Sequence, residues 1–180
     1  TAIGAIGYAL AFDEIIEQCS AQNFNADGIV FTTSSGGTHA GLVAGLVRAR
    51  TRDPLKQLPK IIGIGVAKGT ALSAHSITDL ANETLNLLNE TSRATTDDVS
   101  IDSNYMGSDY AVATQAATDA AKWAAHRGAW VLDAVYSAKG FSGLLGLDAK
   151  NGFGSDANVV FIHTGGLRLY SHRWFTLDIC

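Results

Sequence analysis

Apolar residues along the chain follow two spacings, one typical of buried strands and one typical of helices. Short runs of consecutive apolar residues, many of them β-branched, predict buried strands. Between these runs, apolar residues recur every three or four positions, which predicts amphipathic helices. The predicted strands are residues 28–33, 61–67, 129–133 and 158–166, and the predicted helices are residues 2–20, 38–50, 74–91, 114–128 and 137–152.

This alternation of strands and helices predicts an α/β fold with an open, mainly parallel sheet and helices on both faces. The polar segment 92–104 is interpreted as a loop or a short exposed strand, and Gly128 as a left-handed helix cap. A length of 180 residues suits one domain. The helix at residues 2–20 has no evident cap and no preceding element to pack on, so we expect the chain to be the middle of a longer protein.

Charge and composition narrow the classes of partner. A net charge of −4 gives no electrostatic support for binding nucleic acid or an anionic membrane, and no apolar run approaches the length of about 20 residues needed to span one. Cys19 and Cys180 are too few for a disulfide framework, and the histidines show no metal-binding spacing. We therefore expect a cytoplasmic protein without a metal, a membrane or a nucleic-acid partner.

The segment "TTSSGGTHAG" joins a predicted strand to a predicted helix and carries the first candidate chemistry. A helix N-terminus has unpaired N–H groups and a partial positive charge, and glycines let the backbone fold around an anion. The segment can therefore cradle a phosphate, or it is an ordinary turn with Ser or Thr as the N-cap. Without a following Lys or a GxGxxG pattern, a single phosphate on a cofactor fits better than a nucleotide triphosphate or a dinucleotide. His39 is interpreted as solvated.

Two further polar residues stand near predicted strand ends, where open α/β sheets bind ligands. Thr164, in "NVVFIHTGG", can bond a ligand ring atom, or it belongs to a plain turn. Tyr136, in "LDAVYSAKG", can stack on a ring or act as an acid or base, or it only packs. The residues alone leave both alternatives open.

Four stretches occur in an order and spacing that resemble one known family: "TAIGAIGYALAFDEI", "SSGGTHAGLVAGL", "LDAVYSAKGFSGLL" and "NVVFIHTGG". This is the family of D-cysteine desulfhydrase and 1-aminocyclopropane-1-carboxylate deaminase, which are pyridoxal-phosphate enzymes of the tryptophan-synthase-β type (fold type II). The resemblance implies that the cofactor is pyridoxal 5′-phosphate and that Tyr136, the catalytic candidate, lies near its ring and the substrate. It implies cofactor-binding roles for Ser35, Gly36, Gly37 and Thr38 at the phosphate and for Thr164 at the pyridine nitrogen.

The resemblance also implies a domain and a reaction. Residues 1–167 would be the C-terminal part of such an enzyme, mostly its cofactor-binding large domain, and the full-length protein would be a homodimer. The implied reaction is α,β-elimination from a small amino acid such as D-cysteine, giving pyruvate, ammonia and sulfide. Ser137 and Thr164 favour the desulfhydrase branch, while aminocyclopropane-carboxylate deaminase and cysteate sulfo-lyase are the alternatives within the family.

The chain departs from the family pattern in three places. Family members form a Schiff base with the cofactor through a Lys in an Asn-Lys motif, and no lysine of this chain lies in one. Ala138 replaces an expected Gly, and residues 168–180 form a divergent tail that begins at Arg168. We therefore expect the chain to be inactive by itself. A non-catalytic fragment or pseudoenzyme that binds a phosphate-bearing ligand is the competing hypothesis.

Overall fold

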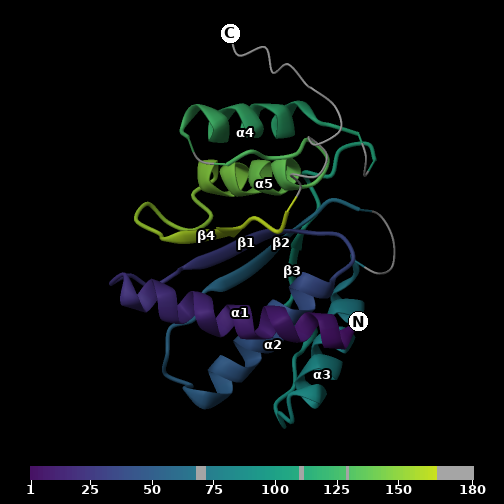
Figure 1. Ribbon diagram of the computed structural model, residues 1–180, viewed down its shortest axis with the longest axis vertical. Helices are drawn as coiled ribbons and strands as arrows, with labels where there is room; N and C mark the ends of the chain where they lie inside the picture. The colour runs from purple at the N-terminus through teal and green to yellow at the C-terminus, as the bar shows by residue number, and fades with distance from the viewer. Residues whose placement is uncertain (68–71, 110–111, 129, 166–180) are drawn as a thin grey trace.

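The computed structural model describes residues 1–67, 72–109, 112–128 and 130–165, and in it a parallel sheet lies between two layers of helices (Figure 1). Four strands form the sheet in the order β3-β2-β1-β4, and all neighbouring pairs are parallel. The predicted α/β fold with helices on both faces is confirmed. The strands are β1 (Gly28–Thr33), β2 (Lys60–Gly65), β3 (Ser100–Asp102) and β4 (Val159–Ile162).

The central strand β1 is buried at every position because it has a neighbour on each side and helices on each face. Its register places Phe31 opposite Gly63 of β2 and Ile162 of β4. A strand with no solvated face has no reason to alternate polar and apolar residues, which explains the continuous apolar run in the sequence.

The helices divide between the two faces of the sheet (Figure 1). One layer packs α1 on α2 and α2 on α3, and in the other layer α4 packs on α5, which contacts β1 and β2. Thr1 caps α1, its hydroxyl accepting a hydrogen bond from the Gly4 N–H at 3.4 Å, so the prediction of an uncapped first helix is wrong. The helices are α1 (Ala2–Ala21), α2 (Gly37–Arg52), α3 (Ala74–Leu87), α4 (Gln115–His126) and α5 (Ser137–Ala149).

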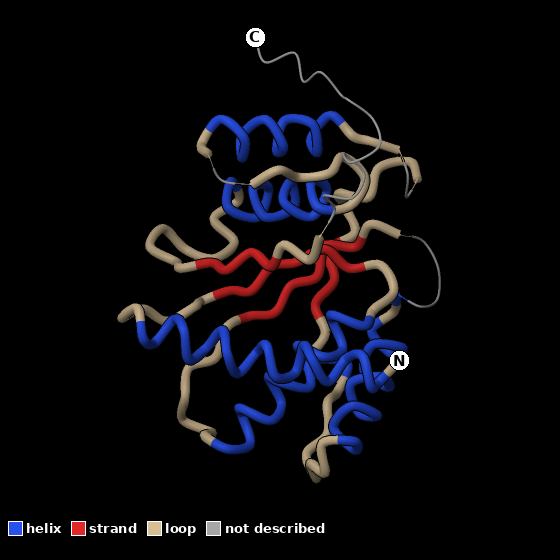
Figure 2. Tube along the Cα trace, in the orientation of Figure 1, coloured by secondary structure: helices blue, strands red, loops and turns tan. Residues whose placement is uncertain are grey.

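The order of the strands reverses direction between β1 and β4 (Figure 2). From β1 the chain steps to β2 and then β3 on one side. It then crosses the opposite face through α4 and α5 and returns as β4 on the other side of β1. Open α/β sheets bind ligands outside the carboxyl ends of the strands at such a reversal. The topology therefore selects the carboxyl ends of β1 and β4 as the place to look for a site.

Several predicted elements differ from the structure. Residues 130–133 form no strand, because Asp133 there turns its carboxylate to the N–H groups that begin α5. The predicted helix 74–91 ends at Leu87, just before Asn89 takes a left-handed φ of 58°. By contrast, the prediction for Gly128 is confirmed, because this residue follows α4 with a left-handed φ of 63°. The segment 92–104 contains a short 3-10 helix (Thr96–Asp98) and the strand β3.

Two further expectations concern the C-terminal tail and membrane-spanning helices. The divergent tail, residues 168–180, lies outside them. Among the helices that are described, none is long and apolar enough to cross a membrane.

Candidate functional site

The turn between β1 and α2 leaves a helix N-terminus open. Gly36 is the N-cap in a left-handed conformation with φ of 79°, and a glycine offers no side chain to the first N–H groups of α2. The alternative of a Ser or Thr N-cap is therefore wrong. The positive end of the helix dipole and its N–H groups together favour an anion at this position.

The surroundings of this turn have room and polar groups for a small anion. Apart from its chain neighbours and the backbone of its own helix, no described atom lies within 4 Å of the point where a Cβ on Gly37 would stand. Ser34 and Thr38 are half-buried and Ser35 is exposed, so their hydroxyls line an accessible turn. The buried Oγ1 of Thr33, at the end of β1, has no hydrogen-bond partner among the described residues. These features fit a bound phosphate.

Tyr136 reaches the same end of β1 from the other side of the sheet. Its hydroxyl donates a hydrogen bond to the carbonyl oxygen of Thr32 at 3.0 Å. Thr32 is the residue before the last of β1, so the phenol lies beside the strand that leads into the glycine turn. The structure thus brings Tyr136 and the Ser35–Thr38 segment to one strand end.

Asp133 holds the backbone of Tyr136 in place, and the sequence reasoning did not single it out. Its carboxylate accepts hydrogen bonds from the N–H of Tyr136 at 2.7 Å and from the N–H and hydroxyl of Ser137 at 2.9 and 2.6 Å. The Asp133 N–H donates in return to the Ser137 hydroxyl at 2.8 Å. This reciprocal pairing is a capping arrangement at the start of α5. The signal in the sequence was the Asp four residues before a Ser at a helix start.

Thr164 lies just beyond β4, at the same edge of the sheet as the glycine turn. It is half-buried, and Gly165 after it takes a φ of 130°. The preceding His163 has its ring Nε2 3.2 Å from the carbonyl oxygen of Val131, which ties the end of β4 to the segment before Tyr136. Since β4 pairs in parallel with β1, the predicted site residues all gather at the carboxyl ends of these two strands. The roles assigned to them stay predictions.

His39 is buried, so its interpretation as a solvated residue is wrong. It lies in the first turn of α2, packs edge-on against Phe31 at 5.0 Å between ring centroids, and is fully excluded from solvent. A Cβ on Gly63 would stand 2.7 Å from its Nδ1, so β2 needs a glycine at that point. Neither ring nitrogen has a hydrogen-bond partner among the described residues, and burial lowers the pKa of His39 from 6.5 to about 4.

We expect His39→Leu to reduce the loss of unfolding free energy between pH 7 and pH 4. Because burial lowers the pKa of His39 in the folded state, its contribution is fully present above about pH 6.5 and is lost as the pH falls toward 4. That loss amounts to about 3 kcal/mol of unfolding free energy for the wild type. Urea unfolding at pH 7 and pH 4 measures it, with the exposed His126→Gln as control. An equal loss in His39→Leu and wild type would refute the assignment.

Residues 2–165 match the family described as pyridoxal-phosphate dependent enzyme. A D-cysteine desulfhydrase of Salmonella typhi is 31% identical over 166 residues, which cover 92% of this chain and 48% of that protein. A 1-aminocyclopropane-1-carboxylate deaminase of Methylobacterium nodulans is 30% identical over 164 residues, which cover 91% of this chain and 47% of that protein.

A solved structure is also similar to this chain in its three-dimensional fold. The crystal structure of an ACC deaminase homologue superposes with a TM-score of 0.76 at 29% sequence identity, covering 93% of this chain and 47% of that one. The chain thus spans about half the length of the relatives it matches.

Proposed function

Since the chain belongs to the family of pyridoxal-phosphate dependent enzymes, we propose that it is part of a lyase that performs α,β-elimination on D-cysteine, giving pyruvate, ammonia and sulfide. The observation that carries the proposal is the meeting of three features at the reversal of the sheet: the open N-terminus of α2, Tyr136 and Thr164. Similarity to relatives named D-cysteine desulfhydrase supports the choice of substrate.

The β1–α2 turn would hold the cofactor phosphate. We assign this role to the N–H groups and hydroxyls of Ser35, Gly36, Gly37 and Thr38, because the turn is open at Gly37 and ends on a positive helix dipole. Thr164 would hydrogen-bond the pyridine nitrogen. A neutral hydroxyl there does not force that nitrogen to be protonated. The cofactor, when bound, supplies an electron sink for the substrate carbanion.

Tyr136 would handle a proton on the substrate side. Its phenol donates to the Thr32 carbonyl at the carboxyl end of β1, and a substrate group bound there would exchange hydrogen bonds with this hydroxyl. The carboxylate of Asp133 fixes the backbone from which this side chain extends. We therefore propose Tyr136 as the acid or base of the site and Asp133 as the residue that orients it.

The chain by itself would not complete the reaction. No Asn-Lys pair occurs in its 180 residues, and covalent catalysis in this family uses the lysine of that motif. Lys139 is buried and bonded to two backbone carbonyls, while Lys56, Lys60, Lys122 and Lys150 are exposed. Binding of the cofactor without turnover is thus the expected behaviour. The homodimer and the cytoplasmic location expected for the full-length protein remain predictions.

A product assay tests the proposed reaction and its main alternative. We expect no sulfide from D-cysteine with the 180-residue chain, and sulfide release by a longer product of the same gene that carries an Asn-Lys motif upstream. Deamination of 1-aminocyclopropane-1-carboxylate is the second candidate, because a relative named for that activity is 30% identical to the chain over 91% of its length. Formation of 2-oxobutyrate from that substrate, without sulfide from D-cysteine, would replace the first proposal by the second.

A further inference from the structure

Lys139 is a buried cation in an unfavourable place. It is fully excluded from solvent and is the third residue of α5, where the helix dipole is positive. Burial lowers the pKa of its ammonium group, and the Asp109 carboxylate offsets this only in part. A buried cation at a helix N-terminus costs stability, and a local rule broken in this way is more common at functional sites than elsewhere.

A turn of the chain at residues 106–109 binds the ammonium group of Lys139. Its Nζ donates hydrogen bonds to the carbonyl oxygens of Met106 at 2.7 Å and Asp109 at 2.8 Å. Gly107 lies between these two residues with φ of 76°, and a Cβ there would collide with the Thr114 side chain and stand 4.0 Å from Nζ. The Met106–Asp109 turn is therefore folded around the ammonium and backed by the start of α4.

This turn follows the carboxyl end of β3, so it lies at the same edge of the sheet as the candidate site. The preceding Ser103 packs where β2 ends, since a Cβ on Gly65 would stand 2.8 Å from its Oγ. Tyr136 is the N-cap of α5 and precedes Lys139 by three residues, so both belong to the start of this helix. Lys139 thus connects a loop at the carboxyl edge to the turn of helix that presents Tyr136.

We propose that Lys139 is a positioning residue of the candidate site, whose ammonium group fixes the Met106–Asp109 turn as a wall beside Tyr136. The wall would limit the space open to a substrate side chain next to the phenol. The effect of this wall on a substrate rests on the function proposed above. The hydrogen bonds between Lys139 and the Met106–Asp109 turn do not depend on that function.

Fluorine NMR of the chain labelled with 3-fluorotyrosine tests this proposal, with the Tyr136 signal assigned by Tyr136→Phe. Lys139→Met keeps the unbranched stem but removes the donor, and Lys139→Arg keeps the charge and donors. Lys122→Met on the exposed face of α4 is the matched control. Pyridoxamine 5′-phosphate serves as ligand because it has no aldehyde that could react with surface lysines. Hydrogen exchange of residues 103–109 is measured in parallel.

In Lys139→Met we expect a displaced Tyr136 signal that no longer responds to pyridoxamine 5′-phosphate, and about tenfold faster exchange in residues 103–109. Lys139→Arg should keep the ligand response of the Tyr136 signal. Lys122→Met should match wild type in both this response and the exchange of residues 103–109. A merely structural lysine would change exchange but leave the ligand response of Tyr136 intact, and that result would overturn the proposal. If Lys139→Met does not fold, a Tyr136 signal in Lys139→Arg that has lost its ligand response would overturn it.

Failure of the proposed function looks different from failure of this inference. If the Tyr136 signal of the wild type does not respond to pyridoxamine 5′-phosphate, the cofactor assignment is wrong. The inference about Lys139 is then judged on the unliganded chain. An unchanged Tyr136 signal and unchanged exchange in Lys139→Met would refute it there.

Discussion

Gly41→Ala is expected to lower the unfolding free energy by about 3 kcal/mol, because the added methyl group has no space. Gly41 lies where α2 crosses α1, and a Cβ there would overlap the backbone carbonyl oxygen of Ala5 and stand 2.6 Å from Cβ of Tyr8. Backbone atoms cannot turn aside as a flexible side chain can, so the two helices must separate. Urea unfolding followed by circular dichroism measures the loss.

Gly7→Ala in α1 is the matched control for this substitution. It makes the same chemical change inside a helix, but no described atom beyond its chain neighbours and the backbone of α1 itself lies within 4 Å of the new Cβ. Here alanine should raise stability by about 0.5–1 kcal/mol through its higher helix propensity. Equal effects of the two substitutions would show that propensity decides, and the close crossing of α1 and α2 would then be wrong.

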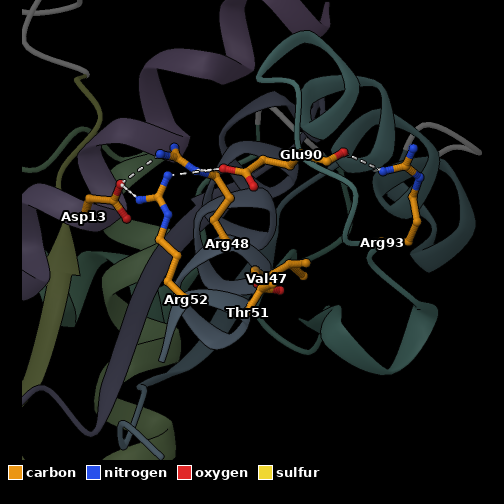
Figure 3. Close-up of polar contacts among 7 residues, drawn as sticks. All are labelled: Asp13, Val47, Arg48, Thr51, Arg52, Glu90 and Arg93. Atoms are coloured by element: carbon orange, nitrogen blue, oxygen red, sulfur yellow. Dashed lines mark hydrogen bonds and ion pairs between the residues drawn. The ribbon is translucent and has the colours of Figure 1, made fainter. Parts of the chain in front are cut away.

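Arg48→Met is expected to cost about 3 kcal/mol of unfolding free energy, because it removes the buried cation of a partly buried cluster of charges (Figure 3). Arg48 on α2 binds Asp13 of α1 at 3.3 Å and Glu90, beyond α3, at 3.1 Å. Its side chain is 8% exposed, and the two carboxylates are 28% and 22% exposed. Without Arg48, both carboxylates lose their buried partner. The ion pairs that link α2 to α1 and to the end of α3 through this side chain are also lost.

Arg52→Met tests whether burial or charge alone sets this cost. Arg52 pairs with the same two carboxylates, at 3.6 Å to Asp13 and 3.2 Å to Glu90, but its side chain is 55% exposed. Water screens such a pair, so we expect a loss of about 0.5 kcal/mol, reduced further by salt. Equal losses in the two variants would contradict the account, since both change the net charge by the same amount.

Local patterns predicted the elements of this fold better than their arrangement. The apolar runs of β1 and β2 and the periodicity of α1 and α2 are properties of short segments, and the structure confirms these elements within a few residues. The clearest failure is at residues 130–133, where apolar side chains suggested a strand. There the Asp133 carboxylate competes successfully for the backbone N–H groups.

The site depended on information that no short segment holds. Sequence placed Tyr136 and Thr164 near strand ends, but it is the hydrogen bond of Tyr136 to Thr32 and the pairing of β4 with β1 that bring them to the end of β1 that leads into the Ser35–Thr38 turn. His39 looked solvated because its burial depends on the distant Gly63. Lys139 and its carbonyl partners are likewise about thirty residues apart, a separation that periodicity cannot read.

Calorimetric titration of the chain with pyridoxamine 5′-phosphate and with pyridoxamine tests the central claim, that the β1–α2 turn grips a cofactor phosphate. We predict that only the phosphate form binds and that inorganic phosphate competes with it. Gly36→Val, which forces valine into a φ of 79°, should weaken binding at least about tenfold. Gly128→Val imposes similar strain at a φ of 63° after α4, which lies on the face of the sheet opposite α2, and should bind as wild type does. Equal binding of both ligands, or unchanged binding by Gly36→Val, would contradict the account.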